Sequence, residues 1–282
     1  DADAAAGKAL FCQAHADSDL TIQVREVDAA RDIEIKTLPC RVEKLEHLAH
    51  DVIRIYLKMP ATERLQFLAG QYIDVLIRDH DPRSFSIANA PHDDEYIELH
   101  IRYVEGGLFT DQVFHHMKEK TLLRIKGPLG TFFLREDSER PIVLIGGGTG
   151  FAPLKGILEH AFEIGVERPI HLFWGVRARR DLYLDELPRQ FARDHSNFSY
   201  TPVLSEPRRD DDWDGETGFV SDAVVSAIPD LSGHDVYMSG PPVMVEAGHA
   251  LFMQHGLDES RFFSDAFEYA AIAESIKGLK QD

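Results

Sequence analysis

The stretch Pro141-Ile-Val-Leu-Ile-Gly-Gly-Gly-Thr-Gly-Phe-Ala-Pro153 decides the fold of this chain. Five residues typical of a buried strand run into a turn that holds four glycines, and a helical apolar periodicity begins at Phe151. Glycine lets backbone N–H groups approach a phosphate closely, and the N-terminus of a helix adds about half a positive charge at the same place. This strand–turn–helix unit therefore predicts a site for a phosphate-bearing ligand.

The spacing of the glycines separates this turn from two better-known phosphate sites. Gly146 and Gly148 fit the dinucleotide pattern G-x-G-x-x-G, but Phe151 stands where the third glycine belongs. A P-loop is excluded because no Lys-Ser/Thr pair follows the glycines. Taken alone, the run is also compatible with a glycine-rich turn that only closes a strand–helix unit.

Length and charge limit the kinds of protein that the chain can be. Its 282 residues are comfortable for two domains. The formal net charge of −18 argues against binding to nucleic acid or to an anionic membrane surface. No apolar run approaches the ~20 residues that span a bilayer. An acidic surface suits a basic protein partner, although solubility alone is enough to explain it.

The two cysteines, Cys12 and Cys40, are too few for a disulfide framework, which favours a reducing compartment such as the cytoplasm. Cys40 stands at the start of a predicted strand, where packing is its expected role. The first residue is Asp, and the segment after it does not resemble a signal peptide. We therefore expect the chain to be the remainder of a longer protein.

The first half of the chain after residue 36 has the pattern of short strands separated by turns. Strand-like composition, partly with period-2 alternation, marks residues 42–45, 52–57, 72–77, 96–103 and 122–126. In the fourth of these, Leu99, Ile101 and Tyr103 share one face. One helix is predicted at residues 110–118. Regular short strands of this kind predict a small antiparallel barrel.

After Pro141 the pattern changes to alternating strands and helices. Strands are predicted at residues 142–145, 170–174, 198–204, 236–238 and 262–264, and helices at residues 152–164, 185–193, 219–228 and 242–254. Alternating β–α units imply a parallel, doubly wound sheet with right-handed crossovers. Ligands of such sheets bind beyond the carboxyl ends of strands, where the glycine-rich turn and Gly240 both fall.

Four short segments carry the residue types of a cofactor site. Arg83-Ser84-Phe85-Ser86 combines a guanidinium suited to phosphate with an aromatic ring on the same strand face, although an edge-strand arginine beside a core phenylalanine explains it as well. Gly106-Gly107-Leu108-Phe109-Thr110 is a second glycine turn that feeds a helix. Gly127-Pro128-Leu129-Gly130 is a rigid turn or a tight hairpin, and Ser239-Gly240-Pro241-Pro242 ends a strand before a helix.

The order of these segments resembles that of one family, the ferredoxin–NADP reductase-like flavoproteins. Its members carry Arg-x-Tyr-Ser or a variant, followed by a Gly-Gly turn, in an antiparallel Greek-key barrel that binds flavin. A doubly wound nicotinamide-binding domain follows, with Gly-Gly-Thr-Gly-x-Ala-Pro and later Cys-Gly-Pro-Pro. The resemblance extends from about residue 38 to the end of the chain. It implies an NAD(P)H-dependent flavoprotein oxidoreductase, with an FAD-binding barrel over residues 37–138 and a nicotinamide-binding domain over residues 139–282.

The resemblance also assigns roles to residues of this chain. Arg83 would hold flavin phosphate, Phe85 would flank the isoalloxazine ring, and Ser86 would lie near its N5. Ser239 and Phe267 would join Ser86 as catalytic residues in contact with the cofactors. The other residues that the resemblance implies in cofactor binding are Ser84, His100, Arg102, Gly106, Gly107, Leu108 and Thr110 on the flavin side, and Gly147, Gly148, Thr149, Gly150, Arg177, Glu206, Gly240 and Pro241 on the nicotinamide side.

Two residues depart from the pattern of the family. Phe85 replaces the commoner tyrosine, which keeps a stacking surface and removes a hydroxyl. Ser239 stands where many relatives have cysteine, so a thiol contribution to hydride transfer is absent. Phe267, in Ser264-Asp-Ala-Phe267, resembles the segment that places an aromatic ring against the flavin, with a buried core phenylalanine as an equal alternative.

Within the family, Leu38-Pro-Cys-Arg-Val42, Phe67-Leu-Ala-Gly-Gln-Tyr72 and Gly107-Leu-Phe-Thr110 resemble one branch most. Members of that branch have an N-terminal plant-type [2Fe-2S] domain, and they include CDP-6-deoxy-Δ3,4-glucoseen reductases and the reductase components of bacterial oxygenases. Residues 1–36 then resemble the remnant of such a domain and its linker. Because this type of cluster needs four thiolates, Cys12 would be the fourth [2Fe-2S] ligand only in a longer chain. A stray cysteine is the alternative.

The resemblance implies that electrons pass from NAD(P)H through FAD to a one-electron acceptor, a [2Fe-2S] centre and then an oxygenase or deoxysugar dehydrase component. NADH is favoured over NADPH because Glu206 follows a strand end, where a carboxylate can accept hydrogen bonds from a ribose. Arg177, with Arg179 and Arg180, could instead grip a 2′-phosphate. A cluster-independent free-flavin or respiratory-type reductase, and a non-catalytic binding module that kept the fold, are the alternatives.

Overall fold

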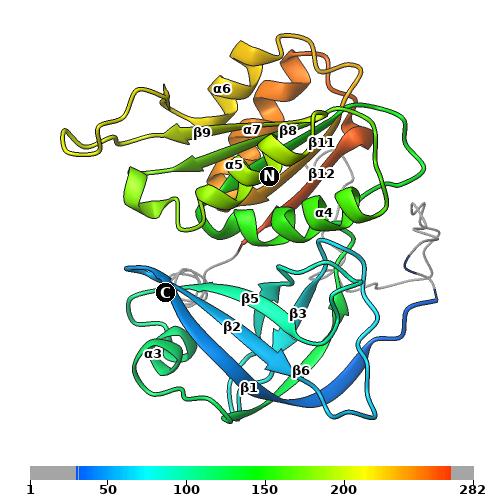
Figure 1. Ribbon diagram of the computed structural model, residues 1–282, viewed down its shortest axis with the longest axis vertical. Coiled ribbons are helices and arrows are strands. Elements are labelled where there is room, and N and C mark those ends of the chain that lie inside the picture. Colours follow the sequence, from blue (N-terminus) through cyan, green and yellow to red (C-terminus); the bar gives the residue numbers. More distant parts are fainter. Residues whose placement is uncertain (1–29, 31, 268–282) are drawn as a thin grey trace, which may run out of the picture. The chain divides into compact units, whose positions relative to one another are not determined.

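The computed structural model describes residue 30 and residues 32–267. Residues 33–267 belong to one compact unit, which holds an antiparallel barrel and a parallel-sheet domain (Figure 1). Cys12 and almost all of the predicted remnant of an iron–sulfur domain lie outside the described residues, as do residues 268–282.

The barrel has its strands in the order β4-β3-β6-β1-β2-β5, with neighbours antiparallel. The bounds are β1 Lys36–Ala49, β2 Val52–Lys58, β3 Tyr72–Val75, β4 Arg83–Ser86, β5 Ile97–Arg102 and β6 Leu122–Leu129, with one helix, α3 Leu108–His115. An antiparallel bridge between Ile87 and Leu99 links the two edges, so the sheet is nearly closed. This confirms the predicted antiparallel Greek-key barrel, and Cys40 packs in its core.

Strand β5 is buried on both faces, whereas the alternation of its sequence predicts one buried face. Leu99 and Ile101 pack in the barrel core as predicted, while Tyr103 lies beyond the end of β5 and is partly exposed. Glu98 and His100, on the opposite face, are also buried. The reason is that the parallel-sheet domain covers this face, a long-range contact that the local pattern does not contain.

The second domain has a wholly parallel sheet in the order β10-β9-β8-β7-β11-β12, which confirms the predicted doubly wound fold. Its strands are β7 Ile142–Gly147, β8 Ile170–Val176, β9 Phe198–Leu204, β10 Glu216–Thr217, β11 Asp235–Gly240 and β12 Phe262–Ala266. Its helices are α4 Phe151–Glu163, α5 Glu186–Asp194, α6 Val220–Ala227 and α7 Pro242–Gln254. The prediction did not include β10, whose two exposed residues carry no apolar pattern.

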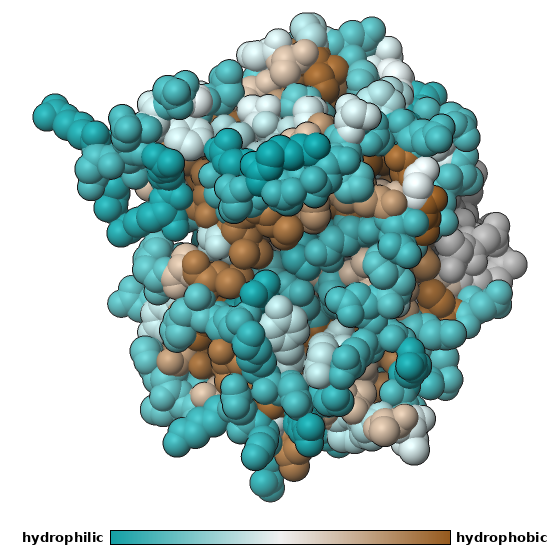
Figure 2. All heavy atoms as spheres, viewed as in Figure 1, coloured by the Kyte–Doolittle hydropathy of each residue, from teal (hydrophilic) through white to brown (hydrophobic). Residues whose placement is uncertain are grey.

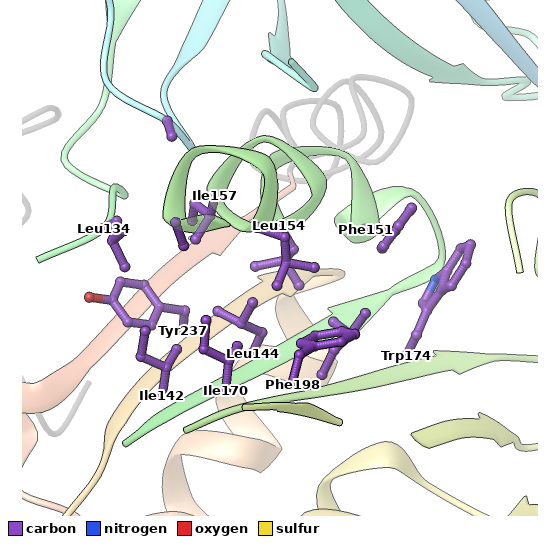
Figure 3. Close-up of a cluster of buried hydrophobic side chains, with 14 of the residues drawn as sticks. Leu134, Ile142, Leu144, Phe151, Leu154, Ile157, Ile170, Trp174, Phe198 and Tyr237 are labelled. Carbon is purple, nitrogen blue, oxygen red and sulfur yellow. The ribbon is translucent and has the colours of Figure 1, made fainter. Parts of the chain in front are cut away.

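Helix α4 packs its apolar face on the parallel sheet and forms the larger core of the second domain (Figure 3). Leu154, Leu158 and Ala161 recur at helical spacing and are fully buried. They belong to one cluster with Leu144 of β7 and Ile170 of β8. Burying each leucine contributes about 1.5–3 kcal/mol. The core therefore fixes α4, and with it the glycine-rich turn that precedes the helix.

Helix α5 is amphipathic and has a charged outer face, which Figure 2 shows as a teal surface over the parallel-sheet domain. Glu186, Arg193 and Asp194 are exposed on this helix, while Leu187 and Phe191 pack against the core. Within residues 30 and 32–267, no helix combines the length and the apolar composition needed to cross a membrane.

Candidate functional site

The glycine-rich turn lies where the strand order of the parallel sheet reverses. The chain leaves β7 towards β8 on one side, while β11 is the neighbour of β7 on the other side. Gly147 ends β7, the short 3-10 turn Gly148–Gly150 leads directly into α4, and Gly240 ends β11. At such a reversal the connections diverge and leave a crevice beyond the carboxyl ends of the strands, which is where ligands of these sheets bind.

At two glycines of this site, backbone atoms lie in or next to the space that a Cβ would need. A Cβ on Gly150 would lie 2.0 Å from the carbonyl oxygen of Ser239, and a Cβ on Gly240 would lie 3.1 Å from the Cα of Gly147. Gly148 has a φ of +54°, in the left-handed region that favours glycine. The ends of β7 and β11 therefore meet backbone against backbone, and a side chain at Gly150 would not fit between them.

Two polar side chains are buried beside the turn. Ser239 is fully buried, and its Oγ has no hydrogen-bond partner within the part of the chain that the structure describes. Leaving a buried hydroxyl without a partner costs about 1–3 kcal/mol, which a polar ligand atom that reached it would recover. Thr149 is buried within the turn itself. Trp174 Nε1 donates to the carbonyl oxygen of Gly148 at 2.9 Å and holds the turn in place.

Strand β4 carries four of the predicted flavin residues of the barrel, Arg83, Ser84, Phe85 and Ser86. Arg83 Nη1 donates to the carbonyl oxygens of Asp81 and Pro82, at 2.9 and 3.1 Å. Phe85 is partly buried, with its ring centroid 5.4 Å from that of Phe109. Ser84 Oγ donates to a carboxylate oxygen of Asp74 at 2.7 Å on the barrel surface. The Arg83 guanidinium thus has no acidic partner among the described residues, and its charge is available to a phosphate.

Ser86 joins the barrel to the parallel-sheet domain. Its Oγ donates to Oδ2 of Asp265 on β12 at 3.0 Å. Asp265 is the register partner of Ser239 on β11, so this hydrogen bond brings β4 to the crevice beside the glycine-rich turn. Burial raises the pKa of Asp265 to about 6, although the hydrogen bond from Ser86 opposes the shift.

Sequence reasoning missed Asp265, because it took only Phe267 from the segment Ser264-Asp-Ala-Phe267. The sequence did offer one signal, an acidic residue directly after a predicted strand, at the edge of the sheet where the parallel strands have their carboxyl ends. Phe267 is partly buried, and its backbone N–H donates to the carbonyl oxygen of Gly240 at 2.9 Å. Pro241 follows Gly240 as the N-cap of α7. Asp265, Phe267 and Ser239 therefore cluster at the ends of β11 and β12.

The second glycine turn is held closed by a threonine. Gly106 has a φ of +74°, and a Cβ on Gly107 would lie 2.7 Å from Thr110 Oγ1. Thr110 Oγ1 accepts from the N–H of Val104 at 3.2 Å and donates to the carbonyl oxygen of Val104 at 3.0 Å. Leu108 is half exposed at the start of α3, while the next residue packs on Phe85. The turn therefore adjoins the strand that carries Arg83.

His100 and Arg102 lie between the two domains rather than on an open surface. Both ring nitrogens of His100 have protein partners, Glu98 at 2.7 Å and Tyr183 at 3.1 Å. Arg102 Nε lies 3.2 Å from a carboxylate oxygen of Asp51. A Cβ on Gly148 would lie 2.6 Å from Arg102 Nη1, so this guanidinium covers the glycine-rich turn.

Arg177 and Glu206 lie on neighbouring turns at the carboxyl ends of β8 and β9. The N–H of Glu206 donates to the carbonyl oxygen of Arg177 at 2.8 Å. Both side chains are exposed, and neither has a side-chain partner in the described ranges. Arg179 instead donates to the carbonyl oxygen of Asp211 at 2.9 Å, and Arg180 lies 3.7 Å from a carboxylate oxygen of Asp181.

The residues present fit the two cofactors that the sequence implies. On the nicotinamide side, the backbone-lined turn would receive a diphosphate, and Ser239 offers an unpaired hydroxyl. On the flavin side, Arg83 offers a guanidinium without an acidic partner beside the Phe85 ring. Clusters of His, Cys, Asp and Glu suited to a metal ion are absent from the described residues.

Family models match both domains of the chain. The model for an oxidoreductase FAD-binding domain matches residues 39–134, and the model for an oxidoreductase NAD-binding domain matches residues 144–249. These matches confirm the predicted cofactor classes of the two domains.

Individual relatives are similar over most of the chain. It is 43% identical over 265 residues to the CDP-6-deoxy-L-threo-D-glycero-4-hexulose-3-dehydrase reductase of Yersinia pestis, covering 94% of this chain and 79% of that one. It is 34% identical to the ferredoxin–NAD(P)(+) reductase component of the naphthalene 1,2-dioxygenase system of Pseudomonas putida, covering 92% and 77%. Among solved structures, the cytochrome P450 reductase of Amycolatopsis superposes with a TM-score of 0.79 at 35% identity, covering 84% of this chain and 72% of that one.

Proposed function

Because the chain belongs to the ferredoxin–NADP reductase-like flavoprotein reductases, we propose that it passes electrons from NADH through FAD to a one-electron acceptor protein. The hydrogen bond between Ser86 and Asp265 carries this proposal, since it joins the flavin strand of the barrel to the nicotinamide crevice. Bound FAD supplies the chemistry of such a relay, because it exchanges electrons either in pairs or singly. The contribution of the protein is position and electrostatics.

The predicted residues that the structure brings to the site then have tasks that their surroundings support. Arg83 neutralises a flavin phosphate, Phe85 flanks the flavin ring, and the turn at Gly106 and Gly107 adjoins them. The glycine-rich turn holds the nicotinamide cofactor, and Ser86, Ser239 and Phe267 line the place where the two cofactors meet. We propose that the flavin domain spans residues 37–138, that the nicotinamide domain spans residues 139–282, and that residues 1–36 are the remnant of a ferredoxin-type domain.

The choice of NADH rests on the turn that holds Glu206. An exposed carboxylate at the end of β9 accepts hydrogen bonds from a ribose and repels a 2′-phosphate. Arg177 has the opposite preference, and it lies on the adjoining turn, where its carbonyl oxygen accepts from the N–H of Glu206. Arg179 and Arg180 contribute less, because Arg179 donates to the carbonyl oxygen of Asp211 in the loop after β9 and Arg180 lies beside the Asp181 carboxylate.

The acceptor is proposed from the relatives. A deoxysugar dehydrase component or an oxygenase component, reached through a [2Fe-2S] centre, suits a reductase whose relatives are named for such systems. In a longer chain Cys12 would supply the fourth ligand of that centre. The low cysteine content suits a cytoplasmic location.

Purified protein tests the function directly. We expect it to bind FAD and to be yellow. Under anaerobic conditions, a low concentration of NADH should bleach the flavin absorbance faster than the same concentration of NADPH. The ratio of kcat/KM for the two nicotinamides, measured with ferricyanide as a one-electron acceptor, should favour NADH by about 10-fold or more, the effect of roughly 1.4 kcal/mol of differential binding. A colourless protein, or a flavin that NADH leaves oxidised, would refute the proposal.

The phosphate role of Arg83 has its own test. Arg83→Ala should purify with depleted flavin and bind added FAD about 10- to 100-fold more weakly, because a charge-assisted hydrogen bond contributes about 1.5–3 kcal/mol. Arg78→Ala is the matched control, since Arg78 lies on the preceding loop with its side chain 95% exposed. Full flavin occupancy in Arg83→Ala, measured by absorbance after denaturation, would remove Arg83 from the phosphate site.

A further inference from the structure

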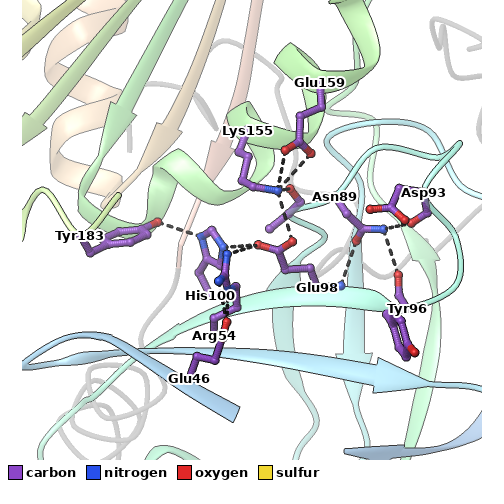
Figure 4. Close-up of polar contacts among 11 residues, drawn as sticks. Glu46, Arg54, Asn89, Asp93, Tyr96, Glu98, His100, Lys155, Glu159 and Tyr183 are labelled. Carbon is purple, nitrogen blue, oxygen red and sulfur yellow. Dashed lines mark hydrogen bonds and ion pairs between the residues drawn. The ribbon is translucent and has the colours of Figure 1, made fainter. Parts of the chain in front are cut away.

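A buried polar network connects the barrel to the parallel-sheet domain, and Glu98 of β5 lies at its centre (Figure 4). Its Oε1 accepts from His100 Nε2 at 2.7 Å and lies 3.7 Å from Arg54 Nη1. Its Oε2 lies 3.2 Å from Lys155 Nζ of α4. Burial raises the pKa of Glu98, but the hydrogen bond from His100 and the charges of Lys155 and Arg54 outweigh it and lower the pKa to about 2. Glu98 is therefore an ionised carboxylate inside a domain interface.

Lys155 depends on the barrel for its hydrogen bonds. An ammonium group has three donors, and Lys155 Nζ has three acceptors. Two belong to the barrel, the carbonyl oxygen of Ala88 at 3.1 Å and Glu98, while only Glu159 lies on the same helix. Lys155 is 5% exposed, so in the observed arrangement protein atoms rather than water satisfy its donors. Its ammonium group is fully paired only when the barrel lies in the observed position against α4.

A second connection runs through His100 to the glycine-rich turn. Because the Glu98 carboxylate only accepts, His100 Nε2 carries the proton, and Nδ1 accepts from the Tyr183 hydroxyl at 3.1 Å. The Tyr183 ring packs edge-on against Trp174, with centroids 5.1 Å apart, and against Phe151 at 6.1 Å. Trp174 in turn donates to the carbonyl oxygen of Gly148. The barrel is thereby connected to both ends of the glycine-rich turn, at Gly148 and at Phe151.

The composition of the network suits a role in fixing the position of the barrel rather than a role in stabilising the fold. Buried ion pairs give little net stability, because desolvation offsets their attraction, and apolar side chains of similar volume pack as well. Apolar side chains, however, allow one surface to slide over another. Hydrogen bonds of fixed length and direction permit one position only.

We propose that Lys155 and Tyr183 are positioning residues for hydride transfer, which hold the barrel at a fixed position against the glycine-rich turn. This inference rests on the proposed function, because the position matters only if a flavin on the barrel reacts with a nicotinamide on the turn. Reacting atoms must approach to about 3–3.5 Å, and a misplacement of 1 Å costs about 100-fold in rate. Neither residue is among those proposed to bind the cofactors, and both make their polar contacts across the domain interface, through which each would act.

Tyr183→Phe and Lys155→Met test the proposal in the purified flavoprotein. We expect the limiting rate constant of flavin reduction by NADH, from anaerobic stopped-flow absorbance, to fall about 5- to 50-fold in each variant. The dissociation constant for NADH and the flavin content should change less than about threefold, because the binding residues are untouched. Tyr200→Phe is the matched control, since it removes a buried tyrosine hydroxyl that donates to Asp185 at 2.8 Å within the parallel-sheet domain alone. It should reduce at the rate of the natural chain.

Hydrogen exchange supplies a second measurement that does not use the reaction. In Lys155→Met, the amides of β5 and α4 should exchange faster, while those of β9 keep their rates. Unchanged reduction rates in Tyr183→Phe, or unchanged exchange in a folded Lys155→Met, would overturn the proposal, as would a lower flavin content or weaker NADH binding at an unaltered limiting rate. If NADH fails to reduce the natural chain, the proposed function is wrong, and faster exchange alone then leaves a structural interface without a role in hydride transfer.

Discussion

Replacing Gly150 by alanine is expected to abolish measurable reduction by NADH and to destabilise the protein by about 3 kcal/mol or more, the upper end of the cost of overpacking. The added Cβ would lie 2.0 Å from the oxygen and 2.5 Å from the carbon of the Ser239 carbonyl. Neither atom belongs to a side chain that could rotate away. Gly150 has a φ of −58°, which any residue adopts, so the whole effect is steric. Relief requires β7 and β11 to separate where the nicotinamide crevice begins.

Gly233→Ala is the control for this change. Gly233 lies in the same domain, and a Cβ there would meet no atom within 4 Å. Chemical unfolding should therefore place Gly233→Ala within about 0.5 kcal/mol of the natural chain, with unchanged NADH reduction. A Gly150→Ala variant that unfolds at the denaturant concentration of the natural chain and is reduced by NADH would show that the turn and Ser239 are not packed as described.

The order of elements could be predicted from the sequence because its signals are local. Periodicity in residues 142–145 and 152–164, with glycines between them, defines one strand–turn–helix unit without information from elsewhere in the chain. Repetition of that unit then implies a parallel sheet, and the bounds of α7 agree with the prediction to the residue. The family resemblance of the short motifs supplied the cofactors, which spacing alone left open.

Contacts between the domains could not be predicted in this way. Glu98 and His100 occupy alternate positions that a half-buried strand leaves to solvent, and in this structure the distant residues Lys155 and Tyr183 contact them there. The same limit applies to Asp265, whose partner Ser86 lies 179 residues away along the chain. A family resemblance predicts which short motifs bind the cofactors. The burial and the hydrogen-bond partners of a side chain between domains depend instead on contacts between segments that are far apart in the sequence.

Asp265→Asn is expected to stabilise the flavin-free protein at neutral pH. The folded pKa of about 6 lies above the ordinary value of 3.8 because burial disfavours the charged carboxylate. Well below the ordinary pKa of 3.8, the carboxyl group is protonated in both the folded and the unfolded chain, and it does not lower the free energy of unfolding. Above about pH 6 it is ionised in both, and the folded chain loses about 3 kcal/mol at most, the energy of a two-unit shift. Stability from this site is therefore lost as the pH rises from about 4 to about 6.

Asparagine has the same shape and cannot ionise, so the gain from the substitution should approach 3 kcal/mol at pH 7.5 and shrink to about 1 kcal/mol at pH 4.5, measured by urea unfolding. Asp74→Asn is the matched control, because Asp74 also accepts a hydrogen bond from a β4 serine, Ser84, but at the surface, where such a pair contributes less than about 1 kcal/mol. Equal gains at both pH values would mean that Asp265 is not a buried acid. A carboxylate that destabilises the fold beside Ser86, where the flavin strand meets the nicotinamide crevice, is the kind of residue that proteins retain at functional sites in spite of its cost in stability.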